Sequence, residues 1–202
     1  MKEKPLIQKA IVFILLLVPV HLLARQIEAQ AMPTQDKGEL AVAATYDASR
    51  ANLTPGNTFW MQGGSIEVSG QFKYGFSAVA SVSGLHNGSL SVPQSLVTVV
   101  FGPRYTFFAH RGAHPLRIFG EALGGEAHGF YGVYPQPVSG PSSNALSVAF
   151  KTGGGVDLGI SRHLDVRLVQ ADWLRTQLPN STTNVQNFML IGAGIVLHTA
   201  TR

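Results

Sequence analysis

The stretch SIEVSGQFKYGFSAVASVSGL, residues 65–85, alternates polar and apolar side chains on both sides of a short turn. Ile66, Val68 and Phe72 share one parity, and the polar residues between them share the other. Alternation with a period of two is what a β-strand with one apolar and one polar face produces. Tyr74-Gly75 interrupts it, so this stretch is predicted to be a β-hairpin.

The same alternation recurs along the chain, in eight runs separated by segments rich in Gly, Pro, Asn and Ser. No run shows the 3.6-residue stripe of an amphipathic helix. In the seventh run the alternation slips near Leu168-Val169, which predicts a β-bulge. The predicted strands are residues 39–50, 65–73, 76–85, 95–108, 116–128, 145–160, 164–174 and 185–198.

The connections between these runs alternate in length. Long connections are expected at 51–64, 86–94, 130–144 and 175–184, and tight turns at 74–75, 109–115 and 161–163. In a meander of paired strands every second connection lies at the same end, so all long loops share one end. Outer-membrane barrels have this arrangement, with short periplasmic turns and longer external loops. Both ends of the barrel segment are then expected on the periplasmic side.

Aromatic residues cluster at both predicted ends of the strands, as expected for girdles at two membrane interfaces. Near the tight turns these residues are Phe72, Tyr74, Phe76, Tyr105, Phe107 and Phe108; near the long loops they are Phe59, Trp60, Phe130, Tyr131, Tyr134 and Trp173.

The N-terminus has the composition of a secretory signal. Lys2, Lys4 and Lys9 precede an apolar run, and Ala29-Gln30-Ala31 supplies small residues for cleavage after Ala31. The predicted organisation is a signal peptide at 1–31, a short periplasmic leader at 32–38, a barrel at 39–198 and a C-terminal tail at 199–202. Export through the Sec pathway is expected.

Charge and cysteine content narrow the function classes. The chain has 15 basic and 11 acidic residues, and removal of residues 1–31 leaves 11 and 9, a net charge of +2. No basic stripe typical of nucleic-acid binding remains. Cysteine is absent, which excludes thiolate metal sites. No second apolar run is long enough for a transmembrane helix, so a membrane-embedded form must be a barrel.

The C-terminal half carries a family resemblance in three stretches: Gly153-Gly154-Gly155-Val156-Asp157, RHLDVR at 162–167 and QADWL at 170–174. Together with the Gly-rich last strand, they resemble the outer-membrane β-barrel domain family. That family includes the transmembrane domain of outer-membrane protein A and opacity-type surface proteins. The resemblance implies an all-β fold, an eight-stranded antiparallel up-and-down transmembrane β-barrel in the outer membrane of a Gram-negative cell.

If the apolar parity faces lipid, the other parity faces the lumen. An eight-stranded barrel is just wide enough for side chains to fill it, and charges there must be paired. We therefore expect a structural network of ion pairs that plugs the lumen. Its predicted members are Glu67, Arg104, Glu121, Lys151, Asp157, Asp165 and Arg167.

Catalytic readings of the same residues are alternatives. Glu121 with Asp157, or Asp165 with Asp172, would have to differ in environment to act as acid and base. A lipid A hydrolase would need a histidine and a serine near the outer rim, such as His128 or His86 with Ser83 or Ser89. His110 and His114 are four apart but lie in a turn, which disfavours a helical zinc motif. Gly153-Gly154-Gly155 lacks the Lys-Ser/Thr of a phosphate loop, and we expect it to allow close strand approach.

The leading prediction is a small outer-membrane barrel with a structural or surface-interaction role and no enzymatic activity, metal or cofactor. The alternatives are a lipid A-modifying outer-membrane hydrolase and a soluble periplasmic, lipocalin-like barrel that binds a small apolar ligand. Expected partners are outer-membrane lipids and the barrel-assembly machinery. We expect a monomer, and the sequence identifies no external partner.

Overall fold

Eight strands make up the described part of the chain. The computed structural model describes residues 40–54, 57–72, 74–88, 94–110, 114–132, 134–135, 141–180 and 183–199. The predicted signal segment and leader, and residues 200–202 of the tail, lie outside this part. Every run predicted from the sequence is a strand. The strands are β1 (Leu40–Thr54), β2 (Asn57–Gln71), β3 (Phe76–Asn87), β4 (Gln94–His110), β5 (Leu116–Phe130), β6 (Ala145–Gly159), β7 (Leu164–Thr176) and β8 (Gln186–His198).

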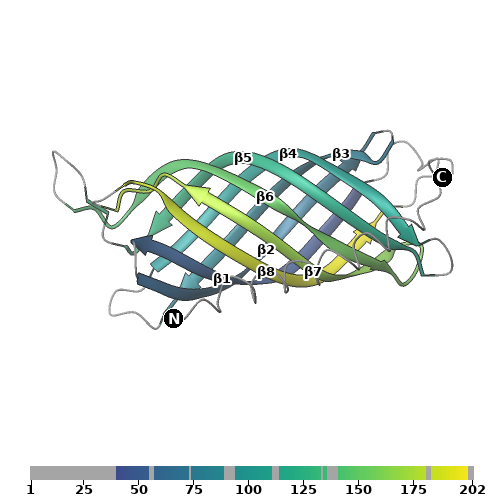
Figure 1. Cartoon of the computed structure of the whole chain (residues 1–202), viewed down its shortest axis with the longest axis horizontal. Coiled ribbons are helices and arrows are strands. Elements are labelled where there is room, and N and C mark those ends of the chain that lie inside the picture. The colour runs from purple at the N-terminus through teal and green to yellow at the C-terminus, as the bar shows by residue number, and fades with distance from the viewer. Residues whose placement is uncertain are drawn as a thin grey trace, which may run out of the picture. The chain divides into compact units, whose positions relative to one another are not determined.

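These strands close into one antiparallel barrel. Each strand pairs with its neighbour in sequence, and β1 also pairs with β8, from Ala41 opposite His198 to Asn52 opposite Asn187. Figure 1 shows the strands inclined to the long axis of the barrel. Closure leaves no edge strand with unpaired backbone groups, which is the condition for a sheet to span hydrocarbon.

The barrel has its apolar side chains outside and its charged side chains inside. Phe101, Val148 and Ile66 point outward and are 71%, 64% and 60% exposed, whereas Glu67 and Arg104 point inward and are buried. An outward apolar band is the mark of a barrel that faces lipid. A soluble ligand-binding barrel needs the opposite polarity, so the lipocalin-like alternative is wrong. No helix among the described residues is long and apolar enough to cross a membrane.

The connections confirm the predicted ends in all but one case. The end with connections 55–56, 88–93, 131–144 and 177–185 is called the loop end, and the end with 72–75, 111–115 and 160–163 the turn end. The prediction of a long first loop at 51–64 is wrong. Strands β1 and β2 stay paired up to Thr54 opposite Asn57. The Gly and Pro residues in this segment suggested a loop, but local composition does not show that β1 is available as a pairing partner.

The aromatic girdles are confirmed in part. Trp60 and Tyr131 near the loop end, and Phe72, Tyr74 and Phe76 near the turn end, are all exposed on the outside. Two predicted girdle members are misplaced. Phe59 packs against the apolar core inside the barrel, and Tyr134 is 2% exposed because its connection folds into the loop end.

Local irregularities match the predicted breaks in alternation. The register shifts between Arg167 and Gln170 on β7, so Leu168 and Val169 both point outward in a bulge. On β6, Gly155 lies opposite Phe119, where a Cβ atom would come within 2.9 Å of the Phe119 ring. The glycine therefore makes room for a large side chain at the centre of the lumen.

Candidate functional site

All seven predicted lumen charges are buried inside the barrel, and Glu67 is the centre of the network. Its Oε2 accepts hydrogen bonds from Arg104 Nη2 at 2.6 Å and from Arg167 Nη1 at 2.7 Å, and its Oε1 lies 3.3 Å from Lys151 Nζ. These partners come from β4, β7 and β6, so one carboxylate on β2 ties four strands together. Such charge-assisted bonds offset the cost of burying the ions.

The remaining carboxylates of the central network have their own partners. Arg104 Nε donates to Glu121 Oε2 at 2.8 Å, and Lys151 Nζ lies 3.3 Å from Glu121 Oε1. Arg167 Nε donates to Asp157 Oδ1 at 2.9 Å. Each of these acids is thus paired with a base, as the predicted structural network requires.

Phe119 sits between the two central guanidinium groups. The Cζ atoms of Arg104 and Arg167 lie 4.2 Å and 4.6 Å from the centre of its ring. Both cations therefore contact the face of an aromatic ring as well as carboxylates, and a dry site strengthens this contact.

Asp165 belongs to a second cluster near the turn end, apart from the network around Glu67. It accepts hydrogen bonds from Arg117 and from His198 Nε2, the latter at 2.9 Å. His198 is the last residue of β8, and Arg117 is the second residue of β5. This cluster therefore links the end of β8 to the neighbouring β7 and, across the lumen, to β5.

Three charged lumen residues were missed by the sequence analysis as network members. Arg117 shares the inward parity of Glu121 on β5, so the alternation itself would have revealed it. Asp172 lies 3.6 Å from Lys151 Nζ and accepts a bond from Gln170 Nε2 at 2.8 Å. Asp47 on β1 is buried beside Thr45. Among the described residues, six buried acids thus face four bases, rather than four facing three.

The half of the lumen toward the loop end has no such charges and is filled by apolar side chains. Leu96, Leu123, Leu174 and Phe188 are each at most 1% exposed and form one cluster. The sequence analysis gave all apolar residues to the lipid face and missed this layer. The signal was present in β4, where Leu96 and Val100 are apolar on the inward parity.

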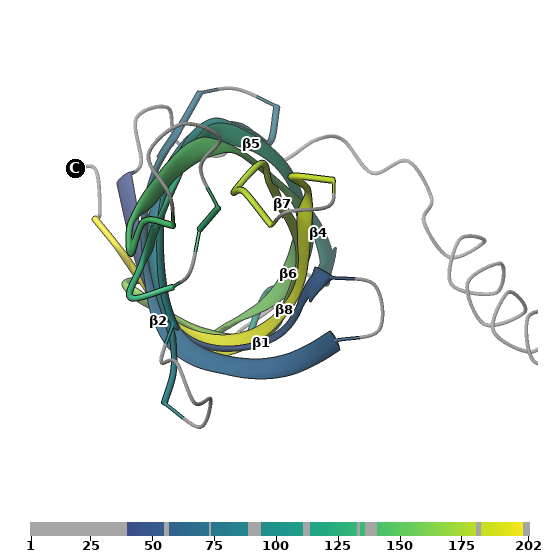
Figure 2. The ribbon, with the colours of Figure 1, turned by 90° about the vertical axis from the view of Figure 1, so that its left-hand side faces the viewer.

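Two connections fold inward and cover this apolar layer. Tyr134, from the β5–β6 connection, is buried, and Gln94 Nε2 donates to its hydroxyl oxygen at 3.1 Å. Burial raises the pKa of the Tyr134 phenol above its usual 10.0. Leu178, from the β7–β8 connection, is fully buried. Figure 2 looks in from the loop end and shows part of the β7–β8 connection across the opening.

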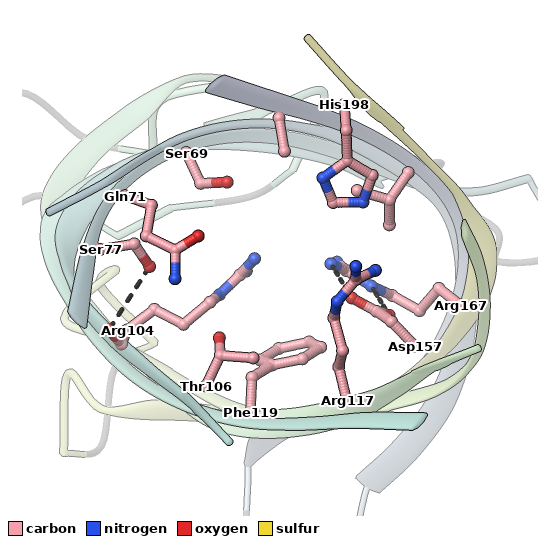
Figure 3. Close-up of a pocket in the computed structure, with 12 residues that line it drawn as sticks. Ser69, Gln71, Ser77, Arg104, Thr106, Arg117, Phe119, Asp157, Arg167 and His198 are labelled. Carbon is pink, nitrogen blue, oxygen red and sulfur yellow. Dashed lines mark hydrogen bonds and ion pairs between the residues drawn. The ribbon is translucent and has the colours of Figure 1, made fainter. Parts of the chain in front are cut away.

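At the turn end the lumen opens into a small polar vestibule. Figure 3 shows the side chains of Arg104, Arg117 and Arg167 pointing into it from different strands, with Gln71 and Ser77 beside Arg104. Beyond the vestibule the ion pairs around Glu67 block the way, and Phe119 lies at its inner boundary. The vestibule is therefore a recess with a closed floor.

The residues proposed for the enzymatic alternative are not assembled into a catalytic site. Ser83 points inward and shares a 2.5 Å hydrogen bond with Thr98, while Ser89 lies outside the described residues. His86 Nδ1 instead lies 2.9 Å from Ser95 Oγ on the outer wall. His128 stacks on Phe130. Among the described residues no group of three potential metal ligands occurs.

Comparison with known proteins identifies the fold. No protein-family profile matches the sequence, and no curated protein does. The crystal structure of Neisserial surface protein A matches with a TM-score of 0.61 and 13% identity, over 80% of this chain and 99% of that one. That of Ail, the attachment invasion locus protein of Yersinia pestis, matches with a TM-score of 0.51 and 12% identity, over 81% and 99%.

The chain is therefore a closed eight-stranded antiparallel β-barrel with the fold of small outer-membrane barrels. It has the fold that Neisserial surface protein A and Ail share, with the apolar wall outside and the charged lumen inside. This confirms the predicted fold class, and the apolar outer wall agrees with the predicted placement in the outer membrane.

Proposed function

We propose that this protein is a structural or surface-interaction barrel that acts through its outer loops and its lipid-facing wall, without catalysis or transport through its lumen. The observation that carries the proposal is the filled lumen. Ion pairs around Glu67 occupy the half toward the turn end, and apolar side chains under Tyr134 and Leu178 occupy the other half. A lumen filled by two layers leaves no aqueous path, so contact with partners falls to the outside.

The names of the similar structures agree with this proposal. One is a surface protein and the other an attachment and invasion protein. Surface roles of this kind use exposed loops on a rigid scaffold, because loops tolerate variation while the barrel holds them in place. The connection 131–144 is the longest of the four at the loop end.

A complementation experiment tests the proposal. A deletion strain receives the wild-type gene, a variant with residues 131–144 replaced by a short Asn-Gly turn, or the lumen variant Ser81→Ala. Adhesion to host cells and survival in serum are compared, and heat-modifiable gel migration confirms that each barrel is folded. We expect the loop variant alone to lose the surface phenotype. Equal behaviour of the loop variant and the wild type in every assay would contradict the proposal.

Transport is tested separately in liposomes. The wild-type barrel is reconstituted and the flux of small ions is measured beside protein-free liposomes. We expect no added flux, because both layers close the lumen. Steady conductance of the wild type would overturn the proposal, because it would show that an aqueous path crosses the lumen.

The hydrolase alternative is tested at the contact between His86 and Ser95, which the described part of the chain brings together on the outer wall. Ser95→Ala and His86→Asn should leave the lipid A profile of the cells unchanged, as judged by mass spectrometry. A lipid A change that appears with the wild type and disappears with Ser95→Ala would replace the present proposal by an enzymatic one.

A further inference from the structure

The lipid-facing wall is not uniformly covered by large side chains. A recess of about 450 Å³ lies across the outer faces of β2, β3 and β4. Its floor is made by Ala78 and Ala80 on β3 and by Pro103 on β4, and aromatic rings stand around it.

The strand register explains why the wall is hollow there. Gly70, Ala78 and Pro103 lie side by side on three adjacent strands, because Gly70 pairs with Ala78 and Ala78 with Pro103. The outward residues beside this row, Phe72, Phe76 and Phe101, are large. The row of small residues across three neighbouring strands therefore leaves a transverse depression between the rings.

The rim of the recess is aromatic and prominent. Phe72 at the end of β2 is 61% exposed, Phe76 at the start of β3 is 53% exposed, and Phe101 on β4 is 71% exposed. Phe76 also packs on Tyr105, with ring centres 5.0 Å apart, so this side of the rim is held in place. The recess is therefore bounded by three exposed rings, one of which packs against a neighbouring ring.

The position of the recess along the barrel indicates which molecule fills it. It begins at the strand ends beside the turn 72–75, whose exposed Tyr74 marks the interface at the turn end. The recess thus lies just inside the hydrocarbon of the periplasmic leaflet, which consists of phospholipid. An apolar hollow in that leaflet has no polar group to hold water and must be filled by an apolar chain.

A second copy of the barrel fits less well. The recess is lined by ten residues, whereas a stable protein interface takes about 20–30 residues on each side. We propose that this recess is a binding site for one acyl chain of a periplasmic-leaflet phospholipid. Without a hydrophobic driving force inside the bilayer, preference for this site comes from van der Waals packing against the rings and the small-residue floor.

The site rests on the proposed placement in the outer membrane, with the turn end at the periplasm. The test uses the barrel in nanodiscs made with a phospholipid that carries a photoactivatable diazirine near the middle of one chain. After illumination, mass spectrometry maps the labelled residues. We expect labelling of strand segments 76–80 and 101–103 to exceed labelling of the β7 and β8 walls about fivefold, which corresponds to about 1 kcal/mol.

Two filling variants and a matched control complete the test. Ala80→Phe and Ala78→Leu fill the floor with apolar groups that a lipid-facing strand accepts, and each should remove the excess labelling. Ala193→Phe makes the same kind of change at an exposed, lipid-facing alanine on β8 and should leave it intact. If one of the two filling variants fails to fold, the labelling of the other variant tests the site.

Three results would overturn the site. They are uniform labelling of all strands, labelling that survives both fillings, and protein–protein cross-links through the recess that show a second copy instead.

If the outer-membrane placement itself were wrong, the barrel would take up no lipid on any wall and would stay in solution without detergent. That outcome differs from uniform labelling and so separates failure of the site from failure of the proposed function.

Discussion

Glu67 and Arg167 are 100 positions apart in the sequence, and Arg167 Nη1 donates a hydrogen bond to Glu67 Oε2 at 2.7 Å. They reach each other across the lumen from β2 and β7, strands that are not paired in the sheet. Both side chains are at most 1% exposed. The contact therefore forms only when the barrel is closed, and it links closure of the sheet to filling of the lumen.

The first prediction is that this pair is coupled. Glu67→Gln or Arg167→Met alone should lower the free energy of unfolding by about 3–5 kcal/mol, because each leaves buried opposite charges without their partner. The double variant should cost less than the two single losses together. Urea unfolding in detergent measures all three. Arg162→Met, at an exposed position in the turn 160–163, is the control and should have little effect. Strict additivity of the two lumen changes would mean that the network does not couple them.

The second prediction concerns the wall. Val99 is 54% exposed and points into lipid from the middle part of β4. Val99→Arg should destabilise the barrel by about 2–4 kcal/mol, because a cation near the bilayer midplane is costly. Val99→Leu keeps the apolar character and serves as the control. Folding into liposomes, followed by urea titration, gives both values. If the arginine variant were as stable as the leucine variant, Val99 would have to face water.

Period-two alternation was sufficient to predict most of this architecture. It assigned Glu67, Arg104, Lys151 and the other four charges to the lumen, because a strand side chain has only two faces to choose from. It could not tell which acid meets which base. That choice depends on the register between strands and on reach across the lumen, as Asp165 shows by pairing with Arg117 and His198.

Two features were not predicted from the sequence, and the first of them depends on tertiary context. Residues 57–64 look like a loop because of Asn57 and the Gly63-Gly64 pair, yet they are strand because β1 pairs with them along their whole length. The apolar layer near the loop end was missed because Leu123 and Leu174 could equally have faced lipid. Only the inward parity set by Glu121 and Asp172 on the same strands decides it.

The third prediction concerns orientation in the cell. The chain has no cysteine, so single cysteines report their own position. Cysteines at Ser143 and Thr183, exposed near the loop end, should react with a membrane-impermeant maleimide on intact cells. Cysteines at Ser161 and Arg162, exposed at the turn end, should react only after the outer membrane is opened. Labelling at the turn end on intact cells would reverse the orientation and would overturn the assignment of the recess to the phospholipid of the periplasmic leaflet.

The last prediction concerns the close approach at the centre of the lumen. A Cβ atom on Gly155 would lie 2.6 Å from the Val169 carbonyl oxygen and 2.7 Å from Cζ of Phe119. The backbone at Val169 cannot move away from Gly155 without disturbing the pairing of β6 with β7. The Phe119 ring cannot move freely either, because it contacts both Arg104 and Arg167. Gly155→Ala should therefore cost about 1–3 kcal/mol by overpacking. Gly84→Ala is the matched control, because a Cβ there meets nothing within 4 Å. It should be neutral or slightly stabilising, since alanine loses less backbone entropy on folding.

Adding Phe119→Leu to Gly155→Ala should recover only part of the loss of stability, because the Val169 carbonyl contact stays and the cation–π contacts disappear. Urea unfolding of the three variants beside the wild type decides the point. Equal stability of Gly155→Ala and Gly84→Ala would show that the strands at Gly155 lie farther apart than the register requires.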